Sequence, residues 1–275
     1  MSHQFIGLLL LIVAVAAGFY VSSHYLQLTS LQLPVPSALN SVQLPSSAVL
    51  NPAPAPAIPT DSQPVTQKPV TISYITLAGS GQSYTELALV VDGGSQPVDV
   101  TGWHIISKSG NSFTIPQAQP LYSFNGAQSD IMLSPGQTLR IFSGSPIIGN
   151  FRMNKCMGYI QDRTSFTPSL PMTCPTTDPS ATVDFSSQCQ DYIASLNACQ
   201  NPSANPPVPP TDDKCFAFLQ TLNYNGCVTA HQQDTDFYSN EWWAWVDNKM
   251  NNFDPTHDKI QLIDPSGNVA DEYTY

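Results

Sequence analysis

Hydrophobic and polar residues follow three different patterns along this chain. Residues 5–21 are an unbroken apolar run, and the first charged side chain of the sequence is Asp61. Residues 34–69 contain nine prolines. Beyond this point, short runs rich in β-branched and aromatic residues alternate with turn residues, as in β-structure. We therefore divide the chain into three parts: an apolar N-terminal segment at 1–25, a linker at 26–69 and a folded region at 70–275.

The apolar run at 5–21 predicts a transmembrane helix. As a helix it spans about 25 Å, slightly less than a hydrocarbon core of about 30 Å. It is longer than a usual signal-peptide apolar region of about 7–15 residues. Ala14 and Ala16 nevertheless form a small-residue cleavage pattern, and no Lys or Arg precedes the run. We expect a single-pass anchor in the cell membrane with the C-terminal domain outside; secretion after signal cleavage is the alternative.

The linker predicts an extended spacer. Proline removes a backbone donor and fixes φ, so neither helix nor sheet propagates through its alternating Pro-Ala run. A polyproline II segment rises about 3.1 Å per residue, so the stretch from 34 to 69 extends up to about 110 Å. Such a stalk would hold a folded head clear of an envelope. A proline-rich ligand for a partner domain is the less favoured hypothesis.

The folded region predicts a series of short strands. We expect them within residues 70–77, 84–91, 97–106, 112–116, 137–142, 241–246, 259–263 and 268–273. This many short strands, without alternating helices, is typical of an all-β, immunoglobulin-like β-sandwich. Trp103 is expected in its core. Glu86 stands in an otherwise apolar strand, where a structural role, such as capping a loop or facing water, is favoured over ligand binding.

Four segments in this order resemble the lamin-tail domain family. They are residues 84–87, residues 98–103, residues 133–136 with the strand that follows, and residues 258–275. The resemblance implies an immunoglobulin-like β-sandwich of a kind that, in bacteria, commonly occurs on exported proteins. It also implies an interaction or envelope module in place of an enzyme.

All six cysteines lie in one part of the chain, and their candidate role is in disulfides: Cys156, Cys174, Cys189, Cys199, Cys215 and Cys227. An even, clustered set after an apolar N-terminus is typical of proteins that fold outside the reducing cytosol. No two of them have the close spacing that a zinc site favours.

The cysteines predict a disulfide-rich, α-helical hairpin insertion at 150–235. Short helices are expected at 191–198 and 216–224, each bracketed by two cysteines. Antiparallel helices pinned at both ends predict the pairs Cys189–Cys227 and Cys199–Cys215, with Cys156–Cys174 closing a separate loop. The local pairs Cys189–Cys199 and Cys215–Cys227 are the alternative. They are disfavoured if both helices run from cysteine to cysteine, because the sulfurs would then lie about 15 Å apart.

Charge and motifs argue against nucleic-acid binding and catalysis. The net charge is −11 and only nine residues are basic, so no stripe of phosphate contacts is expected. The sequence lacks a nucleophile elbow, a P-loop, a zinc-protease motif and a dinucleotide-binding motif. Two acidic clusters, Asp234 and Asp236 near His231, and Asp254 with Asp258 near His257, lie in predicted loops. We expect no metal, no cofactor and no catalytic residue.

The prediction for function is a non-enzymatic cell-surface structural or interaction protein, with an envelope or extracellular protein as its partner. Trp242, Trp243 and Trp245 cannot all face one side of a strand. At least one is expected to cover the insertion or to form an exposed patch, which is the best candidate partner surface. A polysaccharide-binding module that uses these tryptophans is one alternative, and an unrecognised hydrolase is another.

Overall fold

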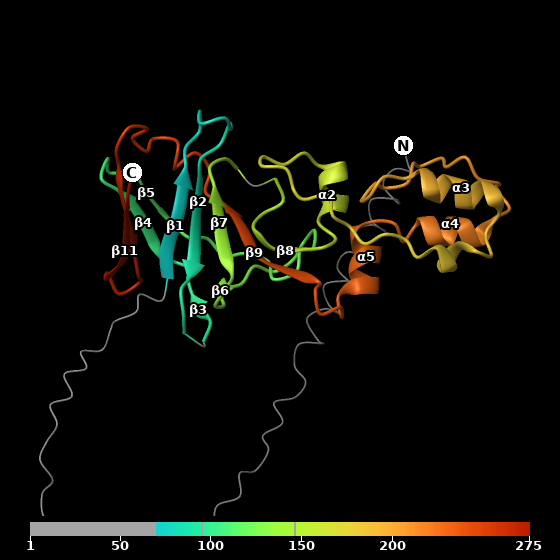
Figure 1. Cartoon of the computed structure of the whole chain (residues 1–275), viewed down its shortest axis with the longest axis horizontal. Coiled ribbons are helices and arrows are strands. Elements are labelled where there is room, and N and C mark those ends of the chain that lie inside the picture. Colours follow the sequence, from blue (N-terminus) through green and yellow to red (C-terminus); the bar gives the residue numbers. More distant parts are fainter. Residues whose placement is uncertain (1–69, 95, 146) are drawn as a thin grey trace, which may run out of the picture. The chain divides into compact units, whose positions relative to one another are not determined.

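The computed structural model describes residues 70–94, 96–145 and 147–275 (Figure 1). The predicted anchor at 1–25 and the linker at 26–69 lie outside the described residues. Within the described ranges, no helix is long and apolar enough to span a membrane. The first described element, β1, begins at Val70, which is the expected start of the folded region.

Strands predominate over helices among the regular elements of the described chain, and they form three sheets. The five-stranded sheet has the order β1 (Val70–Thr76), β2 (Glu86–Val91), β7 (Thr138–Phe142), β9 (Tyr238–Trp245), β8 (Phe151–Asn154). The four-stranded sheet has the order β11 (Val269–Thr274), β10 (Lys259–Ile263), β4 (His104–Ser107), β5 (Ser112–Thr114). The third sheet consists of β3 (Val98–Asp99) and β6 (Met132–Leu133). We call these strands and their connections, residues 70–154 and 238–275, the sheet body.

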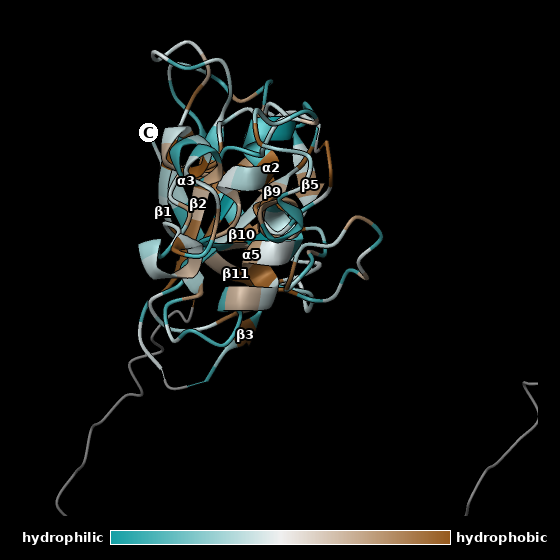
Figure 2. Ribbon diagram, turned by 90° about the vertical axis from the view of Figure 1, so that its right-hand side faces the viewer, coloured by the Kyte–Doolittle hydropathy of each residue, from teal (hydrophilic) through white to brown (hydrophobic). Residues whose placement is uncertain are grey.

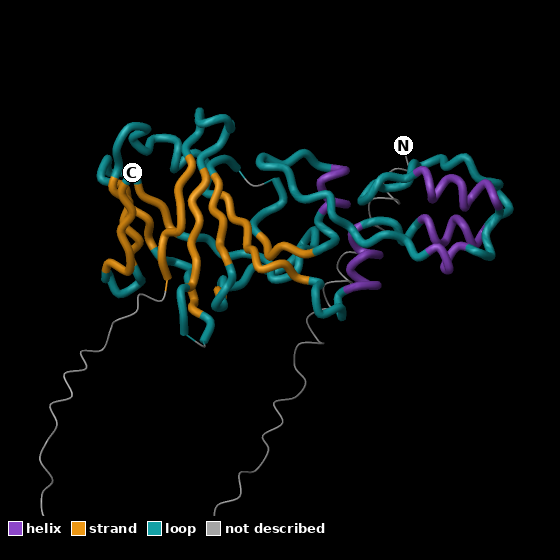
Figure 3. Tube along the Cα trace, viewed as in Figure 1, coloured by secondary structure: helices purple, strands orange, loops and turns teal. Residues whose placement is uncertain are grey.

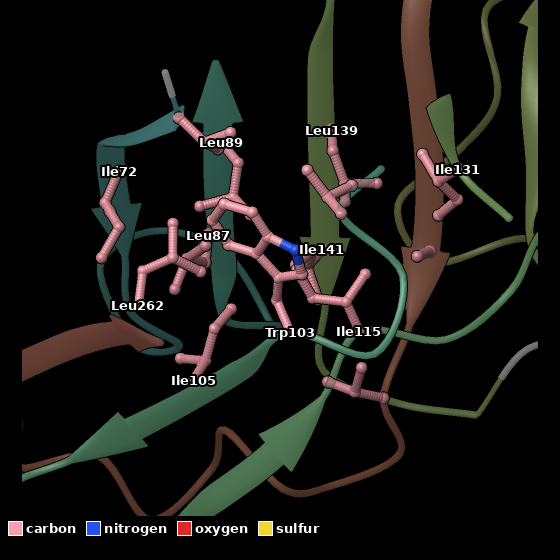
Figure 4. Close-up of a cluster of buried hydrophobic side chains, with 14 of the residues drawn as sticks. Ile72, Leu87, Leu89, Trp103, Ile105, Ile115, Ile131, Leu139, Ile141 and Leu262 are labelled. Carbon is pink, nitrogen blue, oxygen red and sulfur yellow. The ribbon is translucent and has the colours of Figure 1, made fainter. Parts of the chain in front are cut away.

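One core joins the larger sheets. Figure 4 shows aliphatic side chains from β2 and β7 on one side, and from β4 and β10 on the other, gathered around Trp103. Trp103 is 6% exposed, so its prediction as a core residue is confirmed. Because successive side chains of a strand point to opposite faces, Leu87 and Leu89 enter this core together.

The three tryptophans of β9 are all buried, which corrects the prediction of an exposed patch. Trp242 is 4% exposed, Trp243 3% and Trp245 4%. Trp242 belongs to the core between the sheets, whereas Trp243 and Trp245 point to the opposite face and pack beneath the cysteine-rich segment. The expectation that they divide between two faces is therefore confirmed. None of them is available as a surface, because Trp242 is buried between the sheets and the insertion covers Trp243 and Trp245.

The insertion begins later than predicted. Residues 151–154 form β8, a strand that pairs antiparallel with β9 and was missed in the sequence. The cysteine-rich insertion therefore covers residues 155–237. Its elements are α2 (Gly158–Arg163), the 3-10 helix η1 (Pro179–Thr182), α3 (Ser187–Ser195), α4 (Asp213–Leu219) and α5 (Tyr224–His231).

The helix predicted at 216–224 is two helices. The first, α4, ends at Leu219, and Asn223 caps the second, α5, because its side-chain oxygen accepts a hydrogen bond from the Gly226 N–H. Gly226 is required here, since a Cβ at this position would lie 1.9 Å from the Thr221 carbonyl oxygen. The helix predicted at 191–198 is found as α3, which begins and ends a few residues earlier.

All six cysteines form disulfides, but the predicted pairing is wrong. The bonds are Cys156–Cys227, Cys174–Cys199 and Cys189–Cys215, with Cα–Cα distances of 5.8, 5.2 and 6.1 Å. The prediction assumed helices that run from cysteine to cysteine. In the structure Cys199 lies beyond the end of α3, and Cys227 belongs to α5, so both pair outside the α3–α4 hairpin.

The α3–α4 hairpin has a small core of its own. Cys189 and Cys215, each in the first turn of its helix, form this core with Leu219 and nearby partly buried side chains. In Figures 1 and 3 the hairpin lies beyond α2 and α5, at the end opposite β11. Figure 2 shows hydrophobic colouring concentrated on strands, while most loops are polar.

Candidate functional site

A groove of about 550 Å³ lies where the sheet body meets the cysteine-rich insertion. Its lining comes from the connection before β6, from α2, from the start of α5 and from the segment after Cys199. The side chains that matter most are Tyr122, Phe124, Tyr159, Arg163, Tyr224 and Asn225. We call it the junction groove.

One wall of the junction groove is a closed loop of the sheet body. Ala118 and Ser129 exchange two backbone hydrogen bonds of 3.0 and 2.9 Å, which join the ends of loop 118–129. Within the loop, the Gln119 side-chain oxygen accepts a hydrogen bond from the Ser123 N–H at 2.8 Å. Gly126 allows this arrangement, because a Cβ there would lie 2.5 Å from the same Gln119 oxygen. The loop is therefore held from inside, as compact functional loops often are.

Loop 118–129 presents two aromatic rings to the groove. Tyr122 packs edge-on against Tyr224, with ring centroids 5.3 Å apart, and is partly buried. Phe124 is 86% exposed, the most exposed of the large hydrophobic side chains in the part of the chain that the structure describes. A ring held this far into water contributes nothing to the core, so it is available for a partner.

The opposite wall is built by α2 and α5 and held by a disulfide. Cys156 precedes α2 and Cys227 lies in α5, so their bond fixes the two helices relative to each other. Tyr224 is further held by the Asn154 side chain, which donates to its hydroxyl at 3.2 Å. Tyr224 is 9% exposed, which places it at the base of the groove, whereas Asn225 is exposed at its edge.

The segment after Cys199 closes one end. Asn201 donates through its backbone N–H and its side-chain amide to Asp162, at 3.0 and 2.9 Å. Its amide also donates to the Tyr159 carbonyl at 3.0 Å. The Cys174–Cys199 disulfide packs against α2 so closely that a Cβ on Gly158 would lie 2.1 Å from the Cys199 sulfur. Two of the three disulfides thus hold the shape of the groove.

The junction groove is neutral in character. Burial raises the pKa of the Tyr122 and Tyr159 hydroxyls, so both stay protonated at neutral pH. Neither hydroxyl has a protein partner within the described residues. Arg163 is the one charged side chain in the lining, which contains no carboxylate, imidazole or thiol. This arrangement can bind a ligand by stacking and by neutral hydrogen bonds.

The carboxylates of the first acidic cluster of the sequence form ion pairs with a lysine of the protein. The Lys155 ammonium lies 3.0 Å from Asp234 and 2.5 Å from Asp236, and His231 lies 2.9 Å from Asp234. Hydrogen bonds from Lys155 lower the pKa of both carboxyl groups. The lysine occupies the position that a metal ion would need, so the cluster serves as an ion-pair network.

The second acidic cluster caps a turn. The Asp254 carboxylate accepts from the Thr256 N–H and hydroxyl at 2.9 and 2.7 Å. Asp258 is 1% exposed and accepts backbone N–H bonds from Lys108, Asp254 and Lys259. The Asp258 contacts connect the start of β10 to the end of β4. The carboxylates of both residues accept hydrogen bonds from backbone N–H groups of the protein.

Glu86 is buried and paired, which the sequence did not reveal. It is 4% exposed and accepts hydrogen bonds from the Arg140 Nε at 2.6 Å and the Tyr74 hydroxyl at 2.5 Å. Burial, and then the hydrogen bond to Glu86, raise the pKa of Tyr74 to about 12. This network joins β1, β2 and β7, so Glu86 has the structural role that was favoured, through a salt bridge in place of a capped loop.

Within the described residues, the side chains of one further group lie close enough together to hold a metal ion: Cys189, Asp212 and Cys215. The two sulfurs are bonded to each other, and the Asp212 side chain accepts from the Cys215 N–H at 3.1 Å as the cap of α4. No thiolate is left to ligate a metal, and the carboxylate already has backbone partners.

Comparisons with protein families, with curated proteins and with solved structures found no match to this chain. The junction groove is therefore a candidate functional site on the basis of its geometry alone. The groove was not predicted from the sequence because its walls lie far apart in the chain, in loop 118–129, in α2 just after Cys156 and in α5, which contains Cys227. The signal that was present is the placement of Tyr159, Asn201 and Tyr224 within three residues of a cysteine.

Proposed function

We propose that this chain is a non-enzymatic cell-surface interaction protein, in which the sheet body and its insertion form a head that binds a partner in the junction groove. The observation that carries the proposal is the groove itself. The wall built by α2 and α5 is held by the Cys156–Cys227 disulfide, and the edge of the groove carries the exposed ring of Phe124. A concave, pre-formed site with few polar groups is the usual form of a binding site.

The anchor, the stalk and the location outside the cell belong to the same proposal. Three disulfides support folding in an oxidising compartment, because cytosolic thiols are kept reduced. The apolar run at 5–21 supports a membrane anchor, and the proline-rich segment that follows supports a stalk. Secretion after cleavage of the N-terminal segment is the alternative for location.

We also propose that the sheet body is an immunoglobulin-like β-sandwich of the lamin-tail type. The four segments of the resemblance fall on β2, on β3 and the turn after it, on the turn before β7, and on β10 and β11. Two sheets that share one core support this assignment. The parallel pairing of β7 with β9 is the topological feature that a solved lamin-tail relative should share.

The absence of enzymatic activity is proposed from the chemistry of the groove. Its described lining has no carboxylate, imidazole or thiol to serve as a general base or nucleophile. The acidic clusters elsewhere are engaged by Lys155 or by backbone donors. The hydrolase hypothesis would need a catalytic pair that neither region supplies.

Site-specific photo-crosslinking in the full-length protein on the producing cells tests this function. A benzophenone amino acid replaces Asn225 at the groove edge or, as a matched exposed control, Ser266 in the turn between β10 and β11. We expect adducts from position 225 and none from position 266. Adducts from neither position, or equally from both, would contradict the groove as the partner site.

The protein recovered from the membrane fraction in this experiment also reports on export. Its mass should include residue 1 and should rise by six alkyl groups only after reduction. A shorter chain that begins near residue 17 would show that the N-terminal segment is cleaved, and secretion would then replace the membrane anchor in the proposal. Free thiols before reduction would overturn folding in an oxidising compartment.

A further inference from the structure

We propose that the ligand of the junction groove is a neutral polysaccharide chain. The inference rests on the proposed binding function and adds the chemical class of the partner. It also moves the polysaccharide hypothesis from the tryptophans of β9, which are buried, to tyrosine, phenylalanine and asparagine side chains at the junction of the sheet body and the insertion.

Aromatic rings of the groove offer the surface that a sugar ring requires. One face of a pyranose carries mainly C–H groups, and it stacks on an aromatic ring. Tyr122 and Tyr224 form an edge-to-face pair 5.3 Å apart, so their orientations are fixed before a ligand arrives. Phe124 is 86% exposed on the adjacent rim, where burial of its ring by a sugar would be favourable.

The polar groups of the groove suit hydroxyls, which donate and accept at the same time. The Tyr122 and Tyr159 hydroxyls are partly desolvated and have no protein partner within the described residues, so each can both donate and accept. Asn225 is exposed at the start of α5, and its amide offers a donor and an acceptor. A proline-rich peptide would leave the acceptors unused, because proline has no backbone N–H.

Charge favours a neutral chain over an acidic one. The protein carries a net charge of −11, which repels polyanions over long range. Lys155 and Lys259 pair with carboxylates, Arg140 pairs with Glu86, and the Arg152 guanidinium lies over the Tyr238 ring at 4.2 Å. Arg163 alone is a cation of the groove lining, too little to hold an acidic polymer.

A second groove makes a chain more suitable than a single sugar. It has a volume of about 240 Å³ and shares Arg163 and Asn223 with the junction groove. Pro202, Pro206 and Gln220 are among the residues that line it. Because the two grooves adjoin at these shared residues, successive sugar units of a chain would lie from loop 118–129 toward α4.

Affinity electrophoresis of the full-length, oxidised protein in detergent micelles tests the inference. The gels contain hydroxyethyl cellulose, barley β-glucan or soluble starch as neutral probes, and alginate as the acidic probe. We expect at least one neutral polymer to retard the protein, and alginate to have no effect. A soluble proline decapeptide is added as a competitor and should not restore mobility.

Three variants and one control locate the binding. Phe124→Ala removes the exposed ring and should weaken retardation about tenfold. Tyr159→Phe, which removes only a hydroxyl, and Asn225→Ala should each weaken it about fivefold. Val269→Ala on β11 removes an apolar side chain that is 47% exposed outside both groove linings, and should leave retardation unchanged. Unchanged near-ultraviolet circular dichroism confirms that each variant is folded.

The outcomes separate this inference from the proposed function. Absence of retardation by all neutral probes would overturn the inference, and so would equal retardation of all variants. Stronger retardation by alginate, or release by the proline peptide, would replace the ligand class by an acidic polymer or a proline-rich protein. If position 225 still gives photo-adducts in those cases, the junction groove remains a partner site and only its proposed ligand is wrong.

Discussion

The two faces of the five-stranded sheet are covered by different kinds of side chain. On the face toward the four-stranded sheet the buried residues are mainly Leu, Ile and Val, with Trp103 among them. On the other face they are mainly Phe, Tyr, Trp and cystine, contributed by β7, β8, β9 and the cysteine-rich insertion. The first core is made by strands on both sides, whereas the second joins strands to short helices and loops.

This difference follows from what each partner can supply. Two sheets present regular rows of side chains, and branched aliphatic residues fill the space between them with few gaps. The insertion has no such repeat, and its α-helices have only six to nine residues. Isolated helices shorter than about 12–15 residues are marginal in water, so these depend on tertiary contacts and on covalent links.

Aromatic side chains provide the tertiary contacts, and disulfides provide the covalent links. The Phe142 ring lies 4.9 Å from Trp243 and 5.5 Å from Trp245, and the Phe151 ring lies 5.6 Å from Trp245. Large rings bury much surface per residue and tolerate irregular geometry. The comparison implies that the sheet body is stable without cross-links, while the insertion and the junction groove require them.

Reduction of the disulfides should have the largest effect, and this effect should be confined to the cysteine-rich insertion. The Cys156–Cys227 bond spans 71 residues, and a loop of that size corresponds to about 4 kcal/mol of stabilisation. We expect amides of α2 to α5 to lose about a thousandfold of their hydrogen-exchange protection after reduction and alkylation. Amides of β2 and β7 should change by less than about tenfold. Mass-spectrometric hydrogen exchange on the full-length protein measures both.

A smaller cross-link serves as the control for that experiment. Replacing both Cys189 and Cys215 by alanine removes a bond that spans 26 residues within the α3–α4 hairpin. Protection should be lost in α3 and α4 and kept in α2 and α5. Equal loss in β2 and β7 on full reduction would show that the two cores are one cooperative unit, and the comparison would fail.

Gly158→Ala should have an intermediate effect, because it tests how tightly the Cys174–Cys199 bond packs on α2. The added Cβ would lie 2.1 Å from the Cys199 sulfur. Overpacking of this kind costs about 1–3 kcal/mol, although alanine is the better helix former. Thermal unfolding should show a lower Tm for the variant.

The matched control repeats this substitution in a background that lacks the disulfide. With Cys174→Ala and Cys199→Ala both sulfurs are absent and only the Cβ of residue 199, at 2.8 Å, still crowds the added methyl, so Gly158→Ala should lower the Tm less than in the wild type. A loss of Tm that is the same in both backgrounds would place the strain elsewhere in α2.

Asp212→Asn should have the smallest effect and a distinct pH dependence. Hydrogen bonds from Ser186, and then from Cys215, lower the pKa of the Asp212 carboxyl. A carboxyl with a lowered folded-state pKa stabilises above its unfolded pKa of about 3.9, and this stabilisation is lost as pH falls through the folded-state pKa. The Tm of the wild type should exceed that of the variant near neutral pH, and the difference should disappear once the pH falls below the lowered folded-state pKa of Asp212.

The neighbouring Asp213 provides the control for this measurement. It lies in the first turn of α4 and is exposed, whereas the N-cap that accepts the backbone hydrogen bond is Asp212. Asp213→Asn should therefore give a Tm difference with a weaker dependence on pH. If the two variants behave alike, the pH dependence comes from the charge near the helix start and not from the cap that joins α3 to α4.

Much of the fold was predictable because it depends on local pattern. The alternation of apolar residues located β1, β2, β7, β10 and β11 to within a few residues. The three tryptophans of β9 were predicted to divide between two faces, because side chains of a strand alternate whatever covers them. That the outer pair is buried depends on the insertion, which no local pattern could place.

For the disulfides, the sequence predicted the oxidation of the cysteines but not their pairing. Composition and position predicted that all six cysteines would be oxidised. Their pairing was wrong because it depends on where the helices end, and Cys199 and Cys227 lie outside the hairpin that spacing suggested. The strand β8 was missed because only its pairing with β9, more than eighty residues away in the chain, makes residues 151–154 a strand.

What the sequence by itself determined is the character of each part: an apolar N-terminal run, a proline-rich linker, a β-rich region and a cysteine-rich insertion with an even number of thiols. Only the tertiary structure decided which thiols meet, which tryptophans are covered and where a groove opens. The physical reason is distance along the chain. Propensity and alternation act within a few residues, whereas the junction groove depends on Tyr122, Tyr159 and Tyr224, which come together only after the sheets have paired and the insertion has packed on them.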